Sequence, residues 1–338
     1  MVTKSDVTVP LAACSFAATF PQRPDTAGRR RIRRGAAARR QLARGSRLPA
    51  HRKRFITAGR APPFRYTWVM STDLPICRTC GVQYPAPRDD CPICLDERQY
   101  VGWDGQQWTT LAELASAGYR GRVGEEGPGV LGIGSEPAFA IGQRALLITT
   151  PAGNVLWDMI TYLDEELVRQ VRDLGGVSAI AISHPHYYGT MVDWARAFGA
   201  PVYIHSADRP WVARPDPAVR FWDGETQQIG DGLTLINLGV HFAGGQVLHW
   251  AAGEGGAGAL MSGDIIQVVP DRRWVSFMYS YPNLIPERPS VIRRALSLLE
   301  PYPFERVYGA WWRRVVAADG TAAVQRSARR YLRFAGAE

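Results

Sequence analysis

Short apolar stretches separated by Gly, Pro and polar residues run through the chain from about residue 139 onward. Stretches of this length, bounded by turn-forming residues, predict β-strands. The predicted strands lie at 139–141, 145–149, 155–157, 177–182, 201–204, 233–238, 246–250, 258–261 and 306–308. The tetrapeptide Pro-Ala-Gly-Asn at 151–154 separates two of them and predicts a hairpin turn. The Gly-rich segment before them, residues 121–134, is assigned no element.

Amphipathic stretches alternate with several of these strands. Asp164 can cap a helix whose apolar residues share one face, and Gly175 and Gly176 end it. Further helices are predicted at 111–116, 191–198, 291–299 with Ser290 as its cap, and 321–334. Strand–helix–strand units argue for α/β packing, and the element order fits two mixed sheets that are each covered on the outside by helices.

The first 69 residues differ sharply in composition from the rest. They hold fourteen Arg and two Lys against two Asp, a balance of +14. With little apolar periodicity, residues 1–70 are predicted to be a disordered Arg-rich extension. The abrupt change at Met70 favours translation starting there; a targeting peptide, or a lipoprotein box at residues 11–14, is the alternative.

Charge and hydropathy restrict the function classes. The whole chain carries +9, so the part after residue 69 carries −5, which gives no support for nucleic-acid binding by the folded body. Apolar runs such as 177–182 are far too short to span a bilayer. We therefore expect a cytoplasmic protein that acts on a small-molecule substrate and has no membrane partner.

Four of the five cysteines form two Cys-x-x-Cys hooks, which are Cys77 with Cys80 and Cys91 with Cys94. Two such hooks can place four thiolates around one tetrahedral zinc ion. The pattern resembles a zinc ribbon or a rubredoxin-type knuckle, so structural zinc is expected, with iron as the redox alternative and two disulfides as the other alternative. A four-cysteine zinc ribbon is predicted for residues 71–108, and the main domain for 109–338.

The histidines carry the remaining chemistry. The strand predicted at 177–182 runs directly into His184 and His186, and alternate residues at a strand end point to one side. His241 follows on a Gly-rich loop, and Asp264 comes directly after a later strand. Three histidines with an open position form the arrangement that a catalytic zinc requires. His205 and His249 lie at or inside strands and are interpreted as structural.

The order of these motifs resembles the metallo-β-lactamase superfamily over residues 137–315. The resemblance rests on His-x-His at a strand end, the later Gly-x-His-x-x-Gly loop, the Gly-Asp at 263–264 and Asp158 after the early hairpin. It implies an αββα four-layer sandwich and a first metal site of His184, His186 and His241, with Asp264 as fourth ligand or neighbour.

The chain departs from the family pattern at the second metal site. The family reads His-x-His-x-Asp-His, whereas Tyr188 and Gly189 stand at the last two positions here. The family's late Gly-His falls at Gly309-Ala310, which has no histidine. A phenol with a pKa near 10 is a poor zinc ligand at neutral pH, so one metal ion is expected in this site.

These features predict a hydrolase in which zinc-activated water attacks an ester-, thioester-, lactone- or amide-like bond. His184, His186 and His241 would hold the metal, Asp264 would orient or accept the water's proton, and Tyr188 would donate a hydrogen bond to the developing oxyanion. The expected cofactors are one catalytic and one structural zinc, with iron possible. An iron-dependent redox enzyme of the same fold and a non-catalytic member of the fold are the alternatives.

Overall fold

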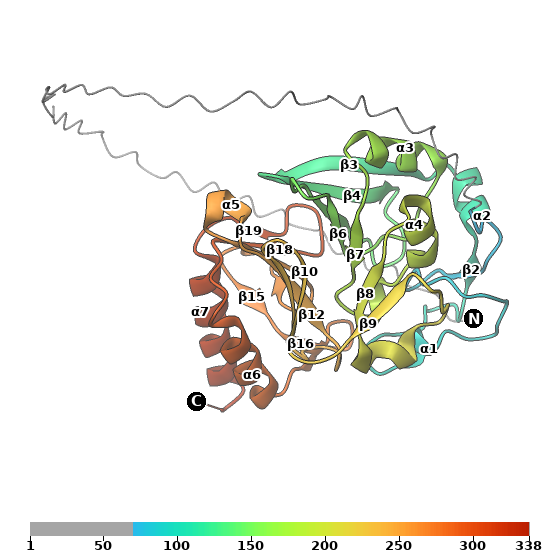
Figure 1. The fold of residues 1–338 in the computed structure, drawn as a ribbon. Coiled ribbons are helices and arrows are strands. Elements are labelled where there is room, and N and C mark those ends of the chain that lie inside the picture. The colour runs from blue at the N-terminus through green and yellow to red at the C-terminus, as the bar shows by residue number, and fades with distance from the viewer. Residues whose placement is uncertain (1–69, 338) are drawn as a thin grey trace, which may run out of the picture. The chain divides into compact units, whose positions relative to one another are not determined.

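The computed structural model of the protein describes residues 70–337, and the predictions for the Arg-rich extension therefore lie outside the described residues apart from Met70. The larger sheet has seven strands in the order β3-β4-β5-β6-β7-β8-β9 (Figure 1). Its members are β3 (Arg120–Gly127), β4 (Val130–Glu136), β5 (Ala145–Ile148), β6 (Val155–Trp157), β7 (Ala179–Ala181), β8 (Val202–His205) and β9 (Val219–Trp222). Pairing is antiparallel from β3 to β6 and parallel from β6 to β9.

The second sheet has six strands in the order β10-β11-β12-β13-β18-β19. Its members are β10 (Thr226–Gly230), β11 (Leu233–Asn237), β12 (Gln246–Trp250), β13 (Ala259–Gly263), β18 (Arg306–Gly309) and β19 (Val315–Val316). Only β13 and β18 pair in parallel within it. Short two-stranded pairs, β14 (Gln267–Val268) with β15 (Val275–Ser276) and β16 (Met278–Ser280) with β17 (Ile285–Pro286), follow β13.

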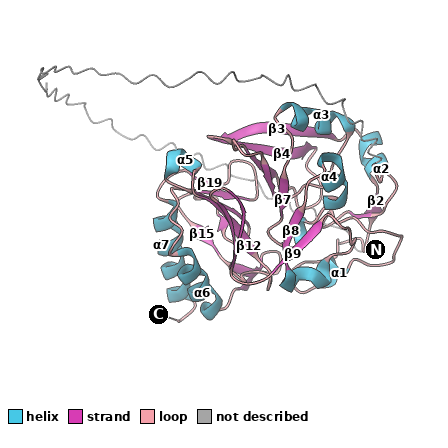
Figure 2. Cartoon of the chain, in the orientation of Figure 1, coloured by secondary structure: helices cyan, strands magenta, loops and turns pink. Residues whose placement is uncertain are grey.

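Helices lie on the outer faces of the two sheets, which gives four layers (Figure 2). The helices α3 (Glu165–Asp173) and α4 (Met191–Phe198) accompany the larger sheet, while α6 (Pro289–Leu299) and α7 (Gly320–Phe334) accompany the smaller one. Because both faces of the central strands are covered, those strands have no polar face. In β6, Val155 and Trp157 pack toward the other sheet and Leu156 packs toward the helices. This is the predicted αββα sandwich.

The segment before the first large sheet is short of regular structure. It contains β1 (Ile76–Cys77), α1 (Pro92–Leu95), β2 (Trp108–Thr109) and α2 (Leu111–Ser116). The four cysteines belong to the same buried apolar cluster as α3, α4 and the His-x-His loop. Thr161 donates through Oγ1 to the carbonyl oxygen of Gly81 at 2.9 Å. The cysteine segment is therefore packed onto the sandwich rather than held apart from it.

The apolar pattern located most elements within two residues. The helix predicted at 111–116 is α2, and the one predicted from Asp164 is α3, whose Leu167 backbone N–H donates to the Asp164 carboxylate at 2.7 Å. The hairpin turn at 151–154 joins the antiparallel strands β5 and β6. No described helix is long and apolar enough to cross a membrane.

Two element predictions were wrong, and one hairpin was not predicted. Residues 139–141 form a turn rather than a strand, with Ala140 in the left-handed region at φ 53°. Ser290 does not cap α6, because that helix begins at Pro289 after Arg288 and has no side-chain cap. The Gly-rich segment 121–134, left unassigned, forms most of the hairpin β3–β4.

The glycines of this hairpin have a packing role. Gly132 and Gly134 lie against the indole of Trp312, and a Cβ added at Gly132 would stand 2.5 Å from a ring carbon. Arg122 covers the indole at 4.3 Å from its ring centroid. The flat glycine surface thus joins the hairpin to the loop after β18, across a gap of about 180 residues in sequence.

Gly132→Ala is expected to lower the free energy of unfolding by about 1–3 kcal/mol, because the new methyl group overpacks against Trp312. Denaturant unfolding measures the change. Gly102→Ala is the matched control, since its nearest neighbour would lie 3.5 Å from the added Cβ. Equal stability of the two variants would contradict the packing role.

Candidate functional site

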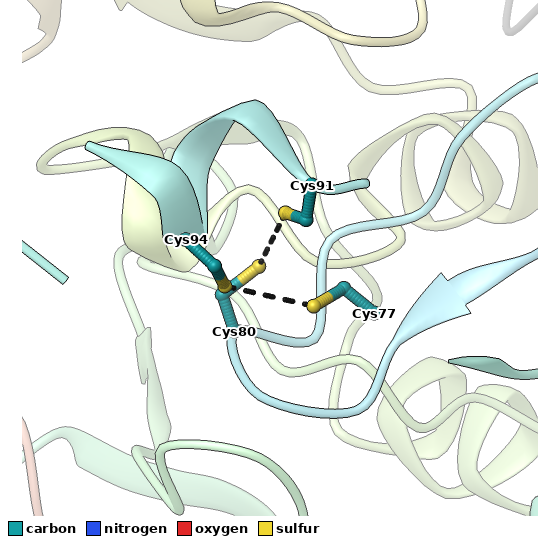
Figure 3. A group of neighbouring side chains, drawn as sticks. All are labelled: Cys77, Cys80, Cys91 and Cys94. Carbon is teal, nitrogen blue, oxygen red and sulfur yellow. Dashed lines mark hydrogen bonds between the residues drawn. The ribbon is translucent and has the colours of Figure 1, made fainter. Parts of the chain in front are cut away.

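The four cysteine sulfurs lie together, as predicted, and can be followed in Figure 3. The Sγ atoms of Cys77 and Cys94 are 3.6 Å apart, as are those of Cys80 and Cys91. Sulfurs bound at about 2.3 Å to one tetrahedral zinc stand roughly 3.7 Å apart, whereas a disulfide needs about 2.05 Å. The thiols are free and buried, so the geometry fits a bound ion and excludes the disulfide interpretation.

Hydrogen-bond donors surround the sulfurs. The Tyr84 hydroxyl lies 3.1 Å from Cys91 Sγ, and Gln106 Nε2 donates to Cys77 Sγ at 3.3 Å. Burial raises the pKa of the Cys80 thiol above its ordinary value. A cation among the sulfurs reverses this effect, because a metal-bound thiol is deprotonated outright. The donor set and its surroundings therefore fit zinc or iron equally.

The three histidines also converge, although they come from two distant stretches of chain. One ring nitrogen from each of His184, His186 and His241 lies within 4.8 Å of the others. His241 Nε2 and His186 Nδ1 are 3.2 Å apart. Two imidazole nitrogens bound at 2.0–2.1 Å to one tetrahedral ion stand about 3.3 Å apart, so the spacing fits a shared metal.

Local backbone geometry directs these rings. His184 is extended at the end of the β7 strand, and a 3₁₀ turn at Pro185–Tyr187 carries His186. His241 adopts φ 68° in the loop between β11 and β12, which contains Gly239, Gly244 and Gly245. The 3₁₀ turn, rather than the alternation of an extended strand, brings the first two imidazoles to one side.

Outer hydrogen bonds orient two of the rings. His241 donates through Nδ1 to the carbonyl oxygen of Tyr279 at 2.8 Å, and His184 Nδ1 lies 2.9 Å from Ser183 Oγ. The Tyr279 contact leaves the Nε2 lone pair of His241 free, and the Ser183 hydroxyl can accept from His184 Nδ1 in the same way, as metal-binding histidines require. Burial lowers the pKa of His241 to about 4 and those of His184 and His186 well below the ordinary value. The imidazoles are therefore neutral at pH 7.

Asp264 joins the cluster from the end of β13. Its Oδ1 lies 3.4 Å from His184 Nε2, and burial raises its pKa to about 7. Among the described residues, nine buried side-chain polar atoms lack a hydrogen-bond partner. Two of them, His184 Nε2 and Asp264 Oδ1, face each other here. Buried polar atoms without partners are costly, and a cation at this point would satisfy the ring nitrogen and the carboxylate together.

Asp158, which the family resemblance identified, supports the histidine cluster through Ser183. It sits directly after β6 at φ 60° and accepts a hydrogen bond from the Ser183 backbone N–H at 2.7 Å. Ser183 in turn contacts His184, so Asp158 fixes the start of the histidine loop. Burial raises the pKa of Asp158 to about 7.

The two substituted positions of the second metal site face the cysteine segment. Gln83 donates its backbone N–H to the carbonyl oxygen of Gly189 at 3.1 Å, and Val82 and Gln83 lie beside Tyr188. A Cβ at Gly189 would stand 3.1 Å from the carbonyl oxygen of Ile160, and the backbone there has φ 43°, so any side chain at this position is disfavoured. The cysteine segment thus packs against the side where the family pattern has further ligands.

The structure places Tyr188 and Tyr187 differently from expectation. The Tyr188 hydroxyl lies 3.5 Å from the carbonyl oxygen of Asp208. Tyr187 instead packs its ring on His184, with ring centroids 4.4 Å apart. In a 3₁₀ turn residues three apart share one face, so Tyr187 lies on the side of His184. The alternation of side chains in an extended strand does not predict this.

At the late Gly-His position, Ala310 is buried and a guanidinium lies beside it. Arg144 donates through Nη1 to the carbonyl oxygen of Gly309 at 2.6 Å and pairs with Glu126 at 2.8 Å. Its charge lowers the pKa of Asp158, although burial dominates there. No sequence pattern marked Arg144 for this position.

Phe242 and Arg98, which the sequence analysis did not predict to be near the site, cover the histidine cluster and shield it from solvent. Phe242 contacts all three imidazoles, with ring centroids 4.9–5.5 Å away. Arg98, from the cysteine segment, stacks on Phe242 at 4.0 Å. The three histidines are only 1–3% exposed as a result. Because 143 residues separate Arg98 from His241, no local pattern could have predicted this contact.

The other two histidines of the described residues bond backbone carbonyls, in line with the structural interpretation. His205 bonds the carbonyl oxygen of Gly224 at 3.0 Å, and His249 bonds that of Pro303 at 2.8 Å.

Metal affinity at the histidine cluster is expected to depend on pH through Asp264. Its pKa of about 7 means that the metal-free carboxyl is protonated below pH 7, so a cation must displace that proton. We expect the affinity for Zn²⁺ to fall about tenfold per pH unit between pH 7 and 5, a range in which His241 stays neutral. Asp264→Asn is expected to bind about 10–100-fold more weakly at pH 8 and with a flatter pH profile. An unchanged slope, measured by competition with a chelator, would exclude Asp264 from the ligand set.

Comparison with known proteins gives one strong sequence match. Over 267 residues the chain is 49% identical to the "Uncharacterized protein YmaE" of Bacillus subtilis (strain 168), which covers 78% of this chain and 97% of that protein. No family model matches the chain.

Solved structures with a similar fold include the DIM-1 metallo-β-lactamase, at 12% identity and a TM-score of 0.48 over 64% of this chain and 98% of that one. VMB-1 gives 13% identity and a TM-score of 0.49 over the same shares of each chain. TTHA1623 in a di-iron-bound form gives 24% identity and a TM-score of 0.39 over 50% of this chain and 86% of that one. In this chain the two sheets pack face to face, and His184, His186, His241 and Asp264 follow the strands β7, β11 and β13.

Proposed function

We propose that this chain, which belongs to the same family as YmaE of Bacillus subtilis and has the metallo-β-lactamase fold, is a hydrolase that uses one metal ion. The substrate class that we propose carries an ester-, thioester-, lactone- or amide-like bond. A second ion, in the cysteine cluster, is proposed to be structural. Zinc is our preferred metal at both sites.

One observation supports this proposal above the others. One ring nitrogen from each of three buried histidines lies within 4.8 Å of the others, and the unpartnered Oδ1 of Asp264 stands 3.4 Å from His184 Nε2. Neutral imidazole and carboxylate are a donor set that a divalent cation prefers. When bound, the ion would supply Lewis-acid polarisation of a carbonyl group and a water of lowered pKa. His184, His186 and His241 would hold it, with Asp264 as fourth ligand or neighbour.

The remaining side chains can handle protons and hydrogen bonds. Asp264, with a pKa of about 7, can accept a proton from water near neutral pH. Burial raises the pKa of the Tyr187 hydroxyl well above the ordinary value, and the charge of Asp264 raises it further. The hydroxyl therefore stays protonated beside that carboxylate and can donate to an oxyanion. This assigns to Tyr187 the role expected of Tyr188. Asp158 and Ser183 hold His184 in place.

A hydrolysis screen tests the proposal. Purified protein is assayed on chromogenic esters, thioesters, lactones and β-lactams, before and after metal removal by a chelator and reloading with Zn²⁺. Turnover that disappears with the metal and returns with it supports the proposal. Turnover that persists in the chelated protein, or fails to appear on any of these bonds in fully loaded protein, contradicts it.

Tyr187→Phe is expected to lower kcat by about 10²–10³-fold, the usual effect of losing one oxyanion donor, with the metal content unchanged. Tyr188→Phe is the matched control, because its hydroxyl faces the Asp208 carbonyl, and it should retain most of the activity. The reverse order of effects would return the catalytic role to Tyr188.

A further inference from the structure

We propose that Arg98 is a positioning residue of the histidine site, and that through it the cysteine-bound ion and the histidine-bound ion strengthen each other's binding. The inference rests on the proposed metal at the histidine cluster. It adds a role for the cysteine segment beyond local folding, since that segment then forms part of the functional site.

A short stretch of the cysteine segment, residues 96–100, lies directly against the loop that supports His241; we term it the strap. Asn283 donates through Nδ2 to the carbonyl oxygens of Glu97 at 2.9 Å and Gln99 at 3.0 Å. Ser280 donates through Oγ to the carbonyl oxygen of Arg98 at 3.1 Å. The Tyr279 hydroxyl donates to the Glu97 carboxylate at 2.6 Å. Tyr279 is also the residue whose carbonyl accepts the Nδ1 hydrogen bond of His241.

Arg98 reaches from the strap to the histidine loop itself. Its Nη1 lies 3.4 Å from the carbonyl oxygen of His241. Its guanidinium covers Phe242 at 4.0 Å and also faces Trp211 at 5.3 Å and Tyr279 at 5.2 Å. Phe242 contacts all three imidazoles. By holding the Phe242 ring in position, Arg98 therefore restricts the three imidazoles that would hold the ion.

The cysteine cluster determines where Arg98 sits. Asp96 ends α1 two residues after Cys94 and binds the guanidinium through both oxygens, to Nε at 2.6 Å and to Nη2 at 2.9 Å. Four thiolates on one ion fix the hook that carries Cys94, and hence Asp96 and Arg98. An ion bound at one site thus orders part of the chain that must also be ordered when the other site binds its ion. Each ion therefore raises the affinity of the other site by the same factor.

Cobalt titration of the full chain tests this inference, because the two sites differ in spectrum. Cobalt on thiolates gives an intense sulfur-to-metal charge-transfer band, whereas cobalt on nitrogen and oxygen gives only weak d–d bands. We expect Arg98→Ala to weaken cobalt binding at the histidine cluster about 10–100-fold, with the thiolate band intact. Arg330→Ala, which removes an arginine stacked at 3.7 Å on Trp274, is the matched control and should change neither site.

A double-mutant cycle adds the decisive comparison. Replacing Cys77 and Cys80 by Ser should weaken the histidine site by a similar factor, and combining this change with Arg98→Ala should add little, because both act through one strap. Arg98→Gln repeats the test should Arg98→Ala fail to fold, as judged by circular dichroism. Two cobalt ions in the wild type with unchanged affinity in the Arg98 variants, or fully additive losses, would overturn the inference alone. Thiolate-bound cobalt only, in the wild type, would overturn the proposed function as well.

Discussion

His184→Ala is expected to reduce the metal content from two ions per chain to one and to lower hydrolysis by at least about a hundredfold. The variant removes a ring nitrogen from the cluster and leaves Asp264 Oδ1 without the imidazole that stands 3.4 Å away. A bound metal contributes several kcal/mol of transition-state stabilisation, and each 1.4 kcal/mol is about tenfold in rate. Elemental analysis by mass spectrometry and the hydrolysis assay measure the two effects.

The control for this variant is another buried histidine outside the cluster. His249 bonds the carbonyl oxygen of Pro303 at 2.8 Å, and glutamine can make the same bond. His249→Gln should therefore keep both ions and full activity. Two ions in His184→Ala, or a loss of one ion in His249→Gln as well, would contradict the assignment of His184 as a ligand.

Replacing Cys77 and Cys80 by Ser is expected to remove the other ion and to destabilise the protein by roughly 3 kcal/mol or more. The cysteine segment has only short elements of its own, and the ion fixes it against the sandwich. A loss of this size corresponds to a decrease in Tm of about 6–12 °C for a domain of this length. Differential scanning calorimetry measures it.

The decrease in Tm should come from loss of the ion, and not from the replacement of the cysteine side chains themselves. Chelation of both ions from the wild-type protein should therefore give a decrease in Tm at least as large, and readdition of Zn²⁺ should reverse it fully only in the wild type. An unchanged Tm in the double variant would show that the cysteine segment folds without its ion.

Much of the sandwich could be predicted, because a strand that is buried on both faces consists almost entirely of apolar residues. Strands such as β7 and β12 read as short apolar runs, and α3 carries a capping Asp164 and a terminal Gly pair. The hairpin β3–β4 was not predicted, because its glycines pack against the indole of Trp312, which lies some 180 residues later in the sequence. Packing against a distant side chain, rather than strand propensity, selects those residues.

The candidate site was predictable to the extent that its ligands lie at strand ends. His184, His186, His241 and Asp264 each follow a strand closely, and the structure brings them together. Tyr187 and Arg98 were missed for different reasons. The first depends on a 3₁₀ turn within one loop, and the second depends on the docking of the cysteine segment.

X-ray diffraction at the zinc absorption edge, on crystals of the full chain grown with Zn²⁺, tests the central claim most directly. The account predicts two anomalous peaks per chain, one among the four sulfurs and one within about 2.0–2.2 Å of His184 Nε2, His186 Nδ1 and His241 Nε2. A fully loaded protein whose only peak lies at the cysteines, with the three imidazoles turned toward other partners, would contradict it.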